Sequence, residues 1–213
     1  MKTGPELAAL LRHRGIPDDR VLAAIAAVPR ELFVPEELRR RAYEDCALPI
    51  GHGQTISQPF MVATICSALE LGTDARVLDV GTGSGYQAAV LAEVAAEVVT
   101  IERVPELADR ARETLVRAGY ERVEVRVGDG TLGVPERAPF DGIAVAAAAP
   151  AIPDTLYEQL CLGGRIVLPV GSLRDQWLEV VERGADGPKF ARSVPCRFVP
   201  LVGAAGFDES HAG

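Results

Sequence analysis

The sequence predicts an α/β fold, with a doubly wound, mostly parallel sheet of seven strands in a single domain. From residue 77 onward short apolar runs alternate with helical patterns, which is typical of parallel strands joined by crossover helices. The first run, at residues 77–80, breaks into glycines and is followed directly by an alanine-rich helical pattern. Two strand-like runs near the C-terminus have no helix between them, so they predict an antiparallel hairpin at the sheet edge.

Length and composition limit the possible classes of protein. The 213 residues suffice for one sizeable domain, and the 48% apolar content argues against disorder. The net charge of −8 argues against a nucleic-acid partner. No apolar run approaches the roughly 20 residues of a membrane span, and the N-terminus lacks the apolar region of a secretory signal. We therefore expect a cytoplasmic protein without a membrane partner, and a monomer.

Cysteine and histidine usage predicts no metal site. The four cysteines are scattered without a C-x-x-C pattern, and there are only three histidines. We expect the cysteines to be reduced and mostly buried.

Residues 1–60 are predicted to form N-terminal helices and a loop that contacts substrate. Amphipathic patterns predict helices at residues 6–14, 18–28 and 36–42. A loop with little periodicity follows at residues 48–59, directly before the core, and its length favours contact with substrate. Within it, Ser57 is expected either to cap a helix at residues 58–71 or to act in the site.

The core, residues 61–202, is predicted to alternate strands and helices, and residues 203–213 form a tail. We expect the end of this tail, from residue 206, to be frayed. The expected strands are residues 77–80, 98–102, 123–127, 141–146 and 165–170, with the edge hairpin at 176–183 and 190–199. The expected helices of the core are residues 84–95, 104–117 and 153–162.

The glycine-rich stretch G-T-G-S-G predicts a nucleotide-type cofactor site. Glycine lets the backbone approach a ligand, and the following helix offers free N–H groups at its start. The spacing G-x-G-x-G differs from the G-x-G-x-x-G of dinucleotide enzymes. Asp79, two residues before Gly81, would repel a pyrophosphate but suits an ammonium and a sulfonium. Glu102 ends the next strand, 21 residues after Gly81, about where an acidic group receives ribose hydroxyls. These features favour S-adenosylmethionine over NAD.

A third acidic residue, Asp129, follows the strand at residues 123–127 within G-D-G. Its position at a strand end beside the expected cofactor would allow its carboxylate to accept a hydrogen bond from an adenine amino group. The alternative is a turn residue without contact to a ligand.

Several segments together resemble one family. In order they are V-P-R-E-L-F-V-P, L-P-I-G-x-G-Q-T-I-S-Q-P, V-L-D-V-G-T-G-S-G-Y-Q-A-A-V-L-A, T-I-E-R, G-D-G, A-P-F-D and R-F-V-P-L. They resemble the protein-L-isoaspartate O-methyltransferases from about residue 18 to residue 202. Many methyltransferases share the glycine motif, whereas G-Q-T-I-S-Q-P and F-V-P-L are far more specific to this family.

The resemblance implies a Rossmann-like class I methyltransferase. It would use S-adenosylmethionine to methylate the α-carboxylate of L-isoaspartyl residues in damaged proteins and peptides, and so initiate repair through a succinimide. Ser57 matches the active-site serine of the family. The implied cofactor contacts are Gly81, Thr82, Gly83, Ser84, Gly85, Glu102, Asp129 and Gly130, beside Asp79 from the charge argument. The implied peptide contacts are Thr55, Ile56, Ser57, Val199, Pro200 and Leu201.

Two positions depart from the family pattern. Ala146 stands where relatives commonly carry threonine, and Thr131 where they often carry tryptophan, which puts the fine substrate preference in question. One alternative is therefore a methyltransferase dedicated to an aspartate of one biosynthetic peptide. An NAD-dependent oxidoreductase is disfavoured by the glycine spacing, and a non-catalytic binder by the intact Ser57, Glu102 and Asp129.

Overall fold

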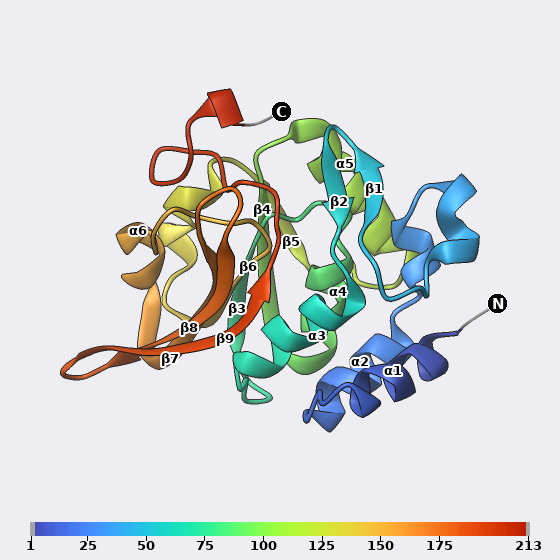
Figure 1. The fold of residues 1–213 in the computed structure, drawn as a ribbon, viewed down its shortest axis with the longest axis horizontal. Helices are drawn as coiled ribbons and strands as arrows, with labels where there is room; N and C mark the ends of the chain where they lie inside the picture. Colours follow the sequence, from blue (N-terminus) through green and yellow to red (C-terminus); the bar gives the residue numbers. More distant parts are fainter. Residues whose placement is uncertain (1–2, 212–213) are drawn as a thin grey trace.

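A twisted sheet of seven strands, in the order β5-β4-β3-β6-β7-β8-β9, forms the centre of the molecule (Figure 1). The computed structural model describes residues 3–211. Strands β5 to β7 pair in parallel, whereas β8 and β9 add an antiparallel hairpin at one edge. The strands are β3 (Arg76–Val80), β4 (Glu97–Glu102), β5 (Glu124–Val127), β6 (Phe140–Val145), β7 (Leu160–Gly171), β8 (Gln176–Gly184) and β9 (Gly187–Cys196). The predicted fold class is confirmed.

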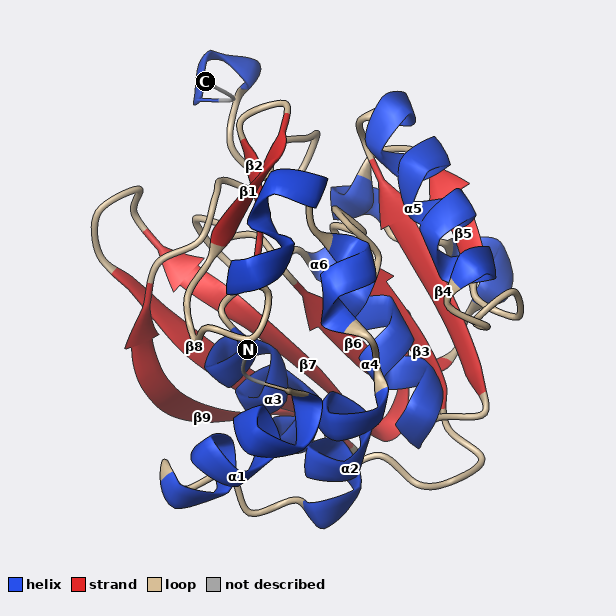
Figure 2. Cartoon of the chain, turned by 90° about the vertical axis from the view of Figure 1, so that its right-hand side faces the viewer, coloured by secondary structure: helices blue, strands red, loops and turns tan. Residues whose placement is uncertain are grey.

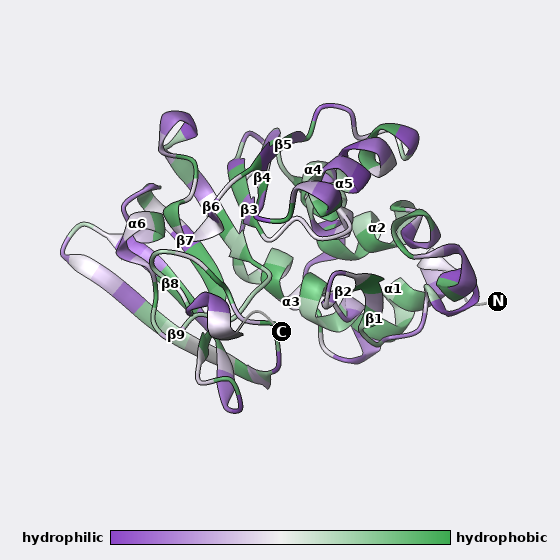
Figure 3. Ribbon diagram, turned by 90° about the horizontal axis from the view of Figure 1, so that it is seen from above, coloured by the Kyte–Doolittle hydropathy of each residue, from purple (hydrophilic) through white to green (hydrophobic). Residues whose placement is uncertain are grey.

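Helices cover both faces of the sheet, which explains the near-continuous apolar runs of its central strands. Successive side chains of a strand point to opposite faces. Val77 of β3 therefore joins the core beneath the N-terminal helices, while Leu78 and Val80 join a second core on the other face. Figure 3 shows the central strands and α3 as mainly hydrophobic, whereas the outer side of α5 is hydrophilic. The longer helices are α1 (Gly4–His13), α2 (Asp19–Ala27), α3 (Pro59–Ala68), α4 (Tyr86–Val94) and α5 (Pro105–Arg117).

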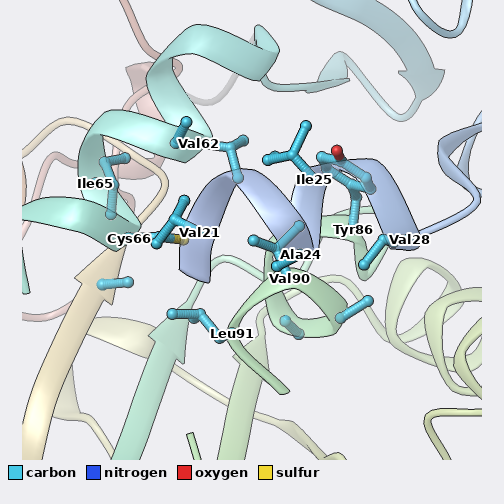
Figure 4. Close-up of a cluster of buried hydrophobic side chains, with 14 of the residues drawn as sticks. Val21, Ala24, Ile25, Val28, Val62, Ile65, Cys66, Tyr86, Val90 and Leu91 are labelled. Atoms are coloured by element: carbon cyan, nitrogen blue, oxygen red, sulfur yellow. The ribbon is translucent and has the colours of Figure 1, made fainter. Parts of the chain in front are cut away.

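The N-terminal helices pack on the core through α2, which lies against α3 and α4 (Figures 2 and 4). Asp18 caps α2 by accepting hydrogen bonds from the amides of Arg20 and Val21. Ile25 of α2 and Val28 at its C-cap are buried against Tyr86 at the start of α4. Two 3₁₀ helices, η1 (Arg30–Phe33) and η2 (Glu36–Arg41), then lead the chain toward the site.

The strands that follow β3 in the chain are added on both of its sides, and this topology determines where the site lies. From β3 the chain proceeds to β4 on one side, while β6 pairs with the other side of β3. The loops that follow β3 and β6 therefore diverge, and a crevice opens between them at the carboxyl ends of the strands.

The region expected as an irregular loop at residues 48–59 is in fact a β-hairpin. β1 (Leu48–Gly51) and β2 (Gln54–Ile56) pair antiparallel in a separate two-stranded sheet. The turn between them, His52-Gly53, has positive φ at both residues (52° and 68°), as a type I′ hairpin turn requires. The strands were missed because each has only three or four residues, too few to show a period.

Two further expectations were wrong. The helix predicted at residues 153–162 is only α6 (Asp154–Tyr157), because β7 begins at Leu160 and contains the two glycines that had indicated a helix end. The tail is not frayed at its start. The Phe207 amide donates to the Leu201 carbonyl at 2.8 Å, and Arg103 lies 3.6 Å from Glu209 in an ion pair. Residues 212–213 of the tail lie outside the described residues.

Within residues 3–211, each helix is too short or too polar to cross a lipid bilayer. The same part of the chain contains no group of three histidine, cysteine or acidic side chains close enough together to hold a metal ion.

Candidate active site

A cleft of about 1020 Å³, including its open mouth, lies at the carboxyl ends of β3, β4 and β6. Its walls come from the glycine loop (residues 81–85), the end of the β1–β2 hairpin and the segment after β9. Figure 1 shows that hairpin and the red C-terminal segment at the same end of the sheet. The predicted site residues on its lining are Thr55, Ile56, Ser57, Gly81, Thr82, Gly83, Ser84, Glu102, Gly130, Val199, Pro200 and Leu201.

The glycine loop has backbone conformations that favour glycine. Gly81, Gly83 and Gly85 have φ values of 92°, 53° and 89°. A Cβ on Gly81 would lie 3.6 Å from the Cβ of Ala146, across the crevice between β3 and β6. A Cβ on Gly85 would instead approach Leu115 of α5 at 3.2 Å. Gly85 is therefore a packing and helix-start residue that does not line the cleft, contrary to the expected cofactor contact.

Glu102 joins the glycine loop to the start of α5. One carboxylate oxygen accepts from the Gly83 amide at 2.9 Å, and the other from the Val104 amide at 3.0 Å. The side chain is only 6% exposed but lines the cleft. A carboxylate held in this way can accept further hydrogen bonds from hydroxyl groups of a ligand.

Asp79 lies beneath the cleft and does not line it. Its side chain points to the α4 face of the sheet, where it accepts from Gln87 Nε2 and from Thr100 Oγ1, each at 2.8 Å. Complete burial raises the pKa of Asp79 to about 6, although these hydrogen bonds act in the opposite direction. Gln87 and Thr82 do line the cleft, so the expected direct contact of Asp79 is revised to an indirect one through its neighbours.

Asp129 also turns away from the cleft. It accepts from the amide and hydroxyl of Thr131, at 2.9 and 2.7 Å, and from the Ala204 amide at 2.8 Å. Partial burial opposes the shift, but these bonds and the charge of Arg103 lower the pKa of the Asp129 carboxyl. The structure matches the turn role, and Gly130 beside it lines the cleft in its place.

Ser57 lies between β2 and α3, and the prediction that it caps this helix was wrong. The N-cap of α3 is Gln58, whose side chain makes no capping hydrogen bond, and the Phe60 amide in the first turn donates to Asp45 Oδ1 at 2.9 Å. The Ser57 carbonyl accepts from Arg30 Nη2 at 2.8 Å, and the residue lines the cleft. Its hydroxyl is therefore not needed for helix capping.

The segment Val199–Leu201 forms the opposite wall by pairing with the chain after β6. The Ala148 amide donates to the Val199 carbonyl at 2.8 Å, and the Leu201 amide donates to the Ala148 carbonyl at 2.7 Å. These two bonds bring the F-V-P-L motif to the cleft from the end of the chain.

Sequence reasoning missed several residues on the cleft lining, among them Gln87 and Arg103. Gln87 had a detectable signal: it is a polar residue in the first turn of α4, a helix that is otherwise almost entirely apolar and buried. Such a position needs a buried partner, which is Asp79.

Comparison with known proteins decides the family. The sequence model of the family described as protein-L-isoaspartate(D-aspartate) O-methyltransferase matches residues 3–206. The chain belongs to this family. It is 55% identical over 198 residues to the protein-L-isoaspartate O-methyltransferase of Methanoculleus marisnigri, covering 92% of this chain and 90% of that protein. It is 57% identical over 196 residues to protein-L-isoaspartate O-methyltransferase 2 of Marinobacter nauticus, covering 91% and 90%.

Solved structures of family members agree with this fold. A protein-L-isoaspartate O-methyltransferase superposes with a TM-score of 0.84 and 30% identity, over 94% of this chain and 66% of that longer chain. A putative family member from Plasmodium falciparum, solved in complex with S-adenosyl-L-homocysteine, superposes with a TM-score of 0.81 and 26% identity, over 95% and 99%. The protein is therefore a methyltransferase enzyme that depends on S-adenosylmethionine.

Proposed function

We propose that the enzyme methylates the α-carboxylate of L-isoaspartyl residues in damaged proteins and peptides. The observation that carries the proposal is the meeting of two walls in one cleft, in a chain of this family. The glycine loop with Glu102 forms one wall, which we call the cofactor wall. Thr55–Ser57 and Val199–Leu201 form the other, which we call the substrate wall.

The residues of the cofactor wall fit S-adenosylmethionine. Glu102 would accept hydrogen bonds from the ribose hydroxyls, and the backbone of Gly81 would lie against the ligand, where a side chain would project toward Ala146. Asp79 would favour the cationic end of the ligand from below, through Gln87. When bound, the cofactor supplies a methyl group that its sulfonium has already activated.

The protein's own task is then positioning. A carboxylate is ionised at neutral pH, so the reaction needs no general base. The cleft must hold the substrate oxygen in line with the methyl carbon and the sulfur, and exclude water. Because charge is neutralised in the transition state, a strong cationic partner for the carboxylate would slow the step. The neutral hydroxyl of Ser57 can orient the oxygen without this penalty.

Main-chain recognition would separate isoaspartate from aspartate, since the two differ in where the backbone leaves the carboxylate. Ala148 pairs with one edge of the segment Val199–Leu201, so the Pro200 carbonyl points to the opposite edge. That edge and residues 55–57 would contact the peptide. The methyl ester would then cyclise to a succinimide without help from the enzyme.

The decisive assay is methyl transfer from labelled S-adenosylmethionine to isoaspartyl peptides and to peptides of the same sequence that contain normal aspartate. We expect turnover of several unrelated isoaspartyl peptides and only background methylation of the aspartyl peptides. Equal methylation of both forms would contradict the proposal. The comparisons give no support to a dedicated biosynthetic peptide, and that alternative predicts turnover of a single sequence only.

We further propose that the enzyme works as a monomer in the cytoplasm and has no nucleic-acid partner. Both walls of the cleft come from one chain. All four cysteines lie within the described residues and are free thiols, which fits a reducing compartment, although only Cys66 is buried as expected. The net charge of −8 would repel a phosphate backbone.

A further inference from the structure

Arg30 is the largest side chain that the fold buries completely, with 0% exposure. It projects from η1, in the segment between the N-terminal helices and the hairpin. Its hydrogen bonds go to neutral main-chain groups, and within the described residues Nη1 has no hydrogen-bond partner. Nε donates to the Ala42 carbonyl and Nη2 to the Ser57 carbonyl, each at 2.8 Å, and Cζ lies 4.4 Å from the centre of the Tyr86 ring.

A guanidinium in these surroundings costs stability. Burial lowers the pKa of Arg30, although Tyr86, Cys46 and Asp45 oppose this shift. Buried charges are usually paired with carboxylates, and an apolar side chain of similar volume often gives equal or greater stability. Packing alone therefore does not explain an arginine here, and the placement of its two hydrogen bonds does.

The contacts of Arg30 reach both sides of the cleft, Ser57 through a hydrogen bond and Tyr86 through its ring. Ser57 belongs to the substrate wall, and Tyr86 is the first residue of α4, immediately after the glycine loop. The β1–β2 hairpin that leads to Ser57 is a separate sheet, so the main sheet does not hold Ser57 in place. The Tyr86 ring is itself fixed, because it packs edge-on against Phe33 with ring centres 5.8 Å apart and against Ile25 and Val28 (Figure 4).

We propose that Arg30 is a positioning residue for methyl transfer, which holds the Ser57 main chain at a fixed place relative to the glycine loop. It touches no reacting atom and acts through Ser57. The inference rests on the proposed role of Ser57 in orienting the substrate carboxylate. Without Arg30, the protein would still bind cofactor, but the hydroxyl and the methyl group would be aligned only part of the time.

The test compares Arg30→Lys and Arg30→Met with the wild type. Lysine keeps the charge, but a single ammonium cannot reproduce the two diverging bonds to Ala42 and Ser57. We expect kcat for an isoaspartyl peptide to fall at least tenfold, with the Kd for S-adenosylhomocysteine changed less than threefold. If Arg30→Lys does not fold, Arg30→Met carries the test, because it removes the buried charge together with both bonds.

Arg20→Lys is the control for the loss of two hydrogen bonds to main-chain carbonyls, made from an exposed arginine. Arg20 likewise joins two carbonyls of the core, those of Leu71 and Val94, but at the end of the sheet away from the cleft. This variant should lose stability without losing kcat per folded molecule. If the folded Arg30 variants keep kcat within twofold of the wild type, or lose no more than Arg20→Lys does, the proposal is overturned.

Hydrogen exchange adds a measurement that needs no substrate. We expect the amides of residues 54–60 to exchange at least tenfold faster in Arg30→Met, with those of α2 unchanged. Uniform acceleration over the whole chain would mean a general loss of stability, and would overturn the proposal. A wild-type enzyme inactive on isoaspartyl peptides would refute the proposed function, whereas the exchange result would still decide whether Arg30 holds Ser57.

Discussion

The cofactor wall and the substrate wall meet in one cleft, but the fold builds them in different ways. The cofactor wall follows two adjacent parallel strands, β3 and β4, and buried bonds among Asp79, Gln87 and Thr100 support it from below. The substrate wall joins segments that are more than 140 residues apart in the chain, from Ser57 to Val199. Its hydrogen bonds come from scattered parts of the chain, among them Arg30, Ala148 and Phe207. The proposed cofactor contacts thus come mainly from one stretch of the chain, whereas the proposed substrate contacts come from segments that only the tertiary fold brings together.

The largest expected effect would come from a side chain at Gly81. Gly81→Val places a branched group toward Ala146, in the crevice where the cofactor would lie, and should weaken S-adenosylhomocysteine binding more than 100-fold in calorimetry. The left-handed φ adds strain of about 1–2 kcal/mol. Gly119→Val is the control, because Gly119 has a φ of 86° but no atom within 4 Å of its added Cβ. It should lose stability but keep affinity. Near-normal binding by Gly81→Val would break the assignment of the cofactor wall.

The second prediction concerns the charge beneath the cofactor wall. Burial raises the pKa of Asp79 from 3.8 to about 6. Its contribution to stability is therefore fully present below pH 3.8, where both states are protonated, and is lost as the pH rises through 6. The loss should be about 3 kcal/mol. Urea unfolding of the wild type and of Asp79→Asn at pH 4 to 7 gives the free energy of unfolding of each. The difference between the two free energies should change over this pH range by the amount lost. A difference that is constant with pH contradicts this prediction.

Glu102→Ala should have a smaller effect on the same wall. It removes the proposed acceptor of the ribose hydroxyls and should weaken cofactor binding by about 1–3 kcal/mol. It also frees the Gly83 amide, so Glu102→Gln, which keeps an acceptor oxygen, should lose less. Calorimetry with S-adenosylhomocysteine compares the two variants. Unchanged affinity in the alanine variant would refute the ribose assignment.

The smallest energetic effect is expected at Ser57, on the substrate wall. Because Gln58 and not Ser57 is the N-cap of α3, Ser57→Ala should change the free energy of unfolding by less than about 0.5 kcal/mol. We expect the single-turnover methylation rate to fall about tenfold or more, with cofactor affinity kept, as loss of one orienting hydrogen bond implies. Intact-mass analysis with cofactor alone completes the test. A stable methyl group on Ser57 would overturn direct transfer.

The sequence was sufficient for the parallel core and for most of the cofactor wall. The apolar runs of β3, β4 and β6 are buried on both faces, so the pattern and the structure have the same cause. The glycines of the loop were recognisable because few other residues adopt their backbone conformations. The different roles of the individual glycines could not be recognised from the sequence. Only the structure shows that Gly81 faces the crevice while Gly85 packs against α5.

What could not be predicted depends on contacts between distant segments. Asp129 was interpreted from its position at a strand end, but its oxygens are engaged by Thr131 and by Ala204 of the tail. β7 begins earlier than expected because Leu160 pairs with Phe140, which no local pattern records. Ser57 and Val199–Leu201, which the family resemblance indicated, line the cleft, and periodicity alone had left their roles open.

The pairing of Val199–Leu201 with Ala148 has a consequence for the order in which the two walls form during folding. Gly81 and Glu102 are 21 residues apart, whereas the two segments of the substrate wall are separated by more than 140 residues. Closing a longer stretch of chain costs more entropy, so contacts between distant segments form more slowly. The substrate wall should therefore form after the cofactor wall, and a chain that has completed only the first would hold its methyl donor before it could recognise a damaged protein.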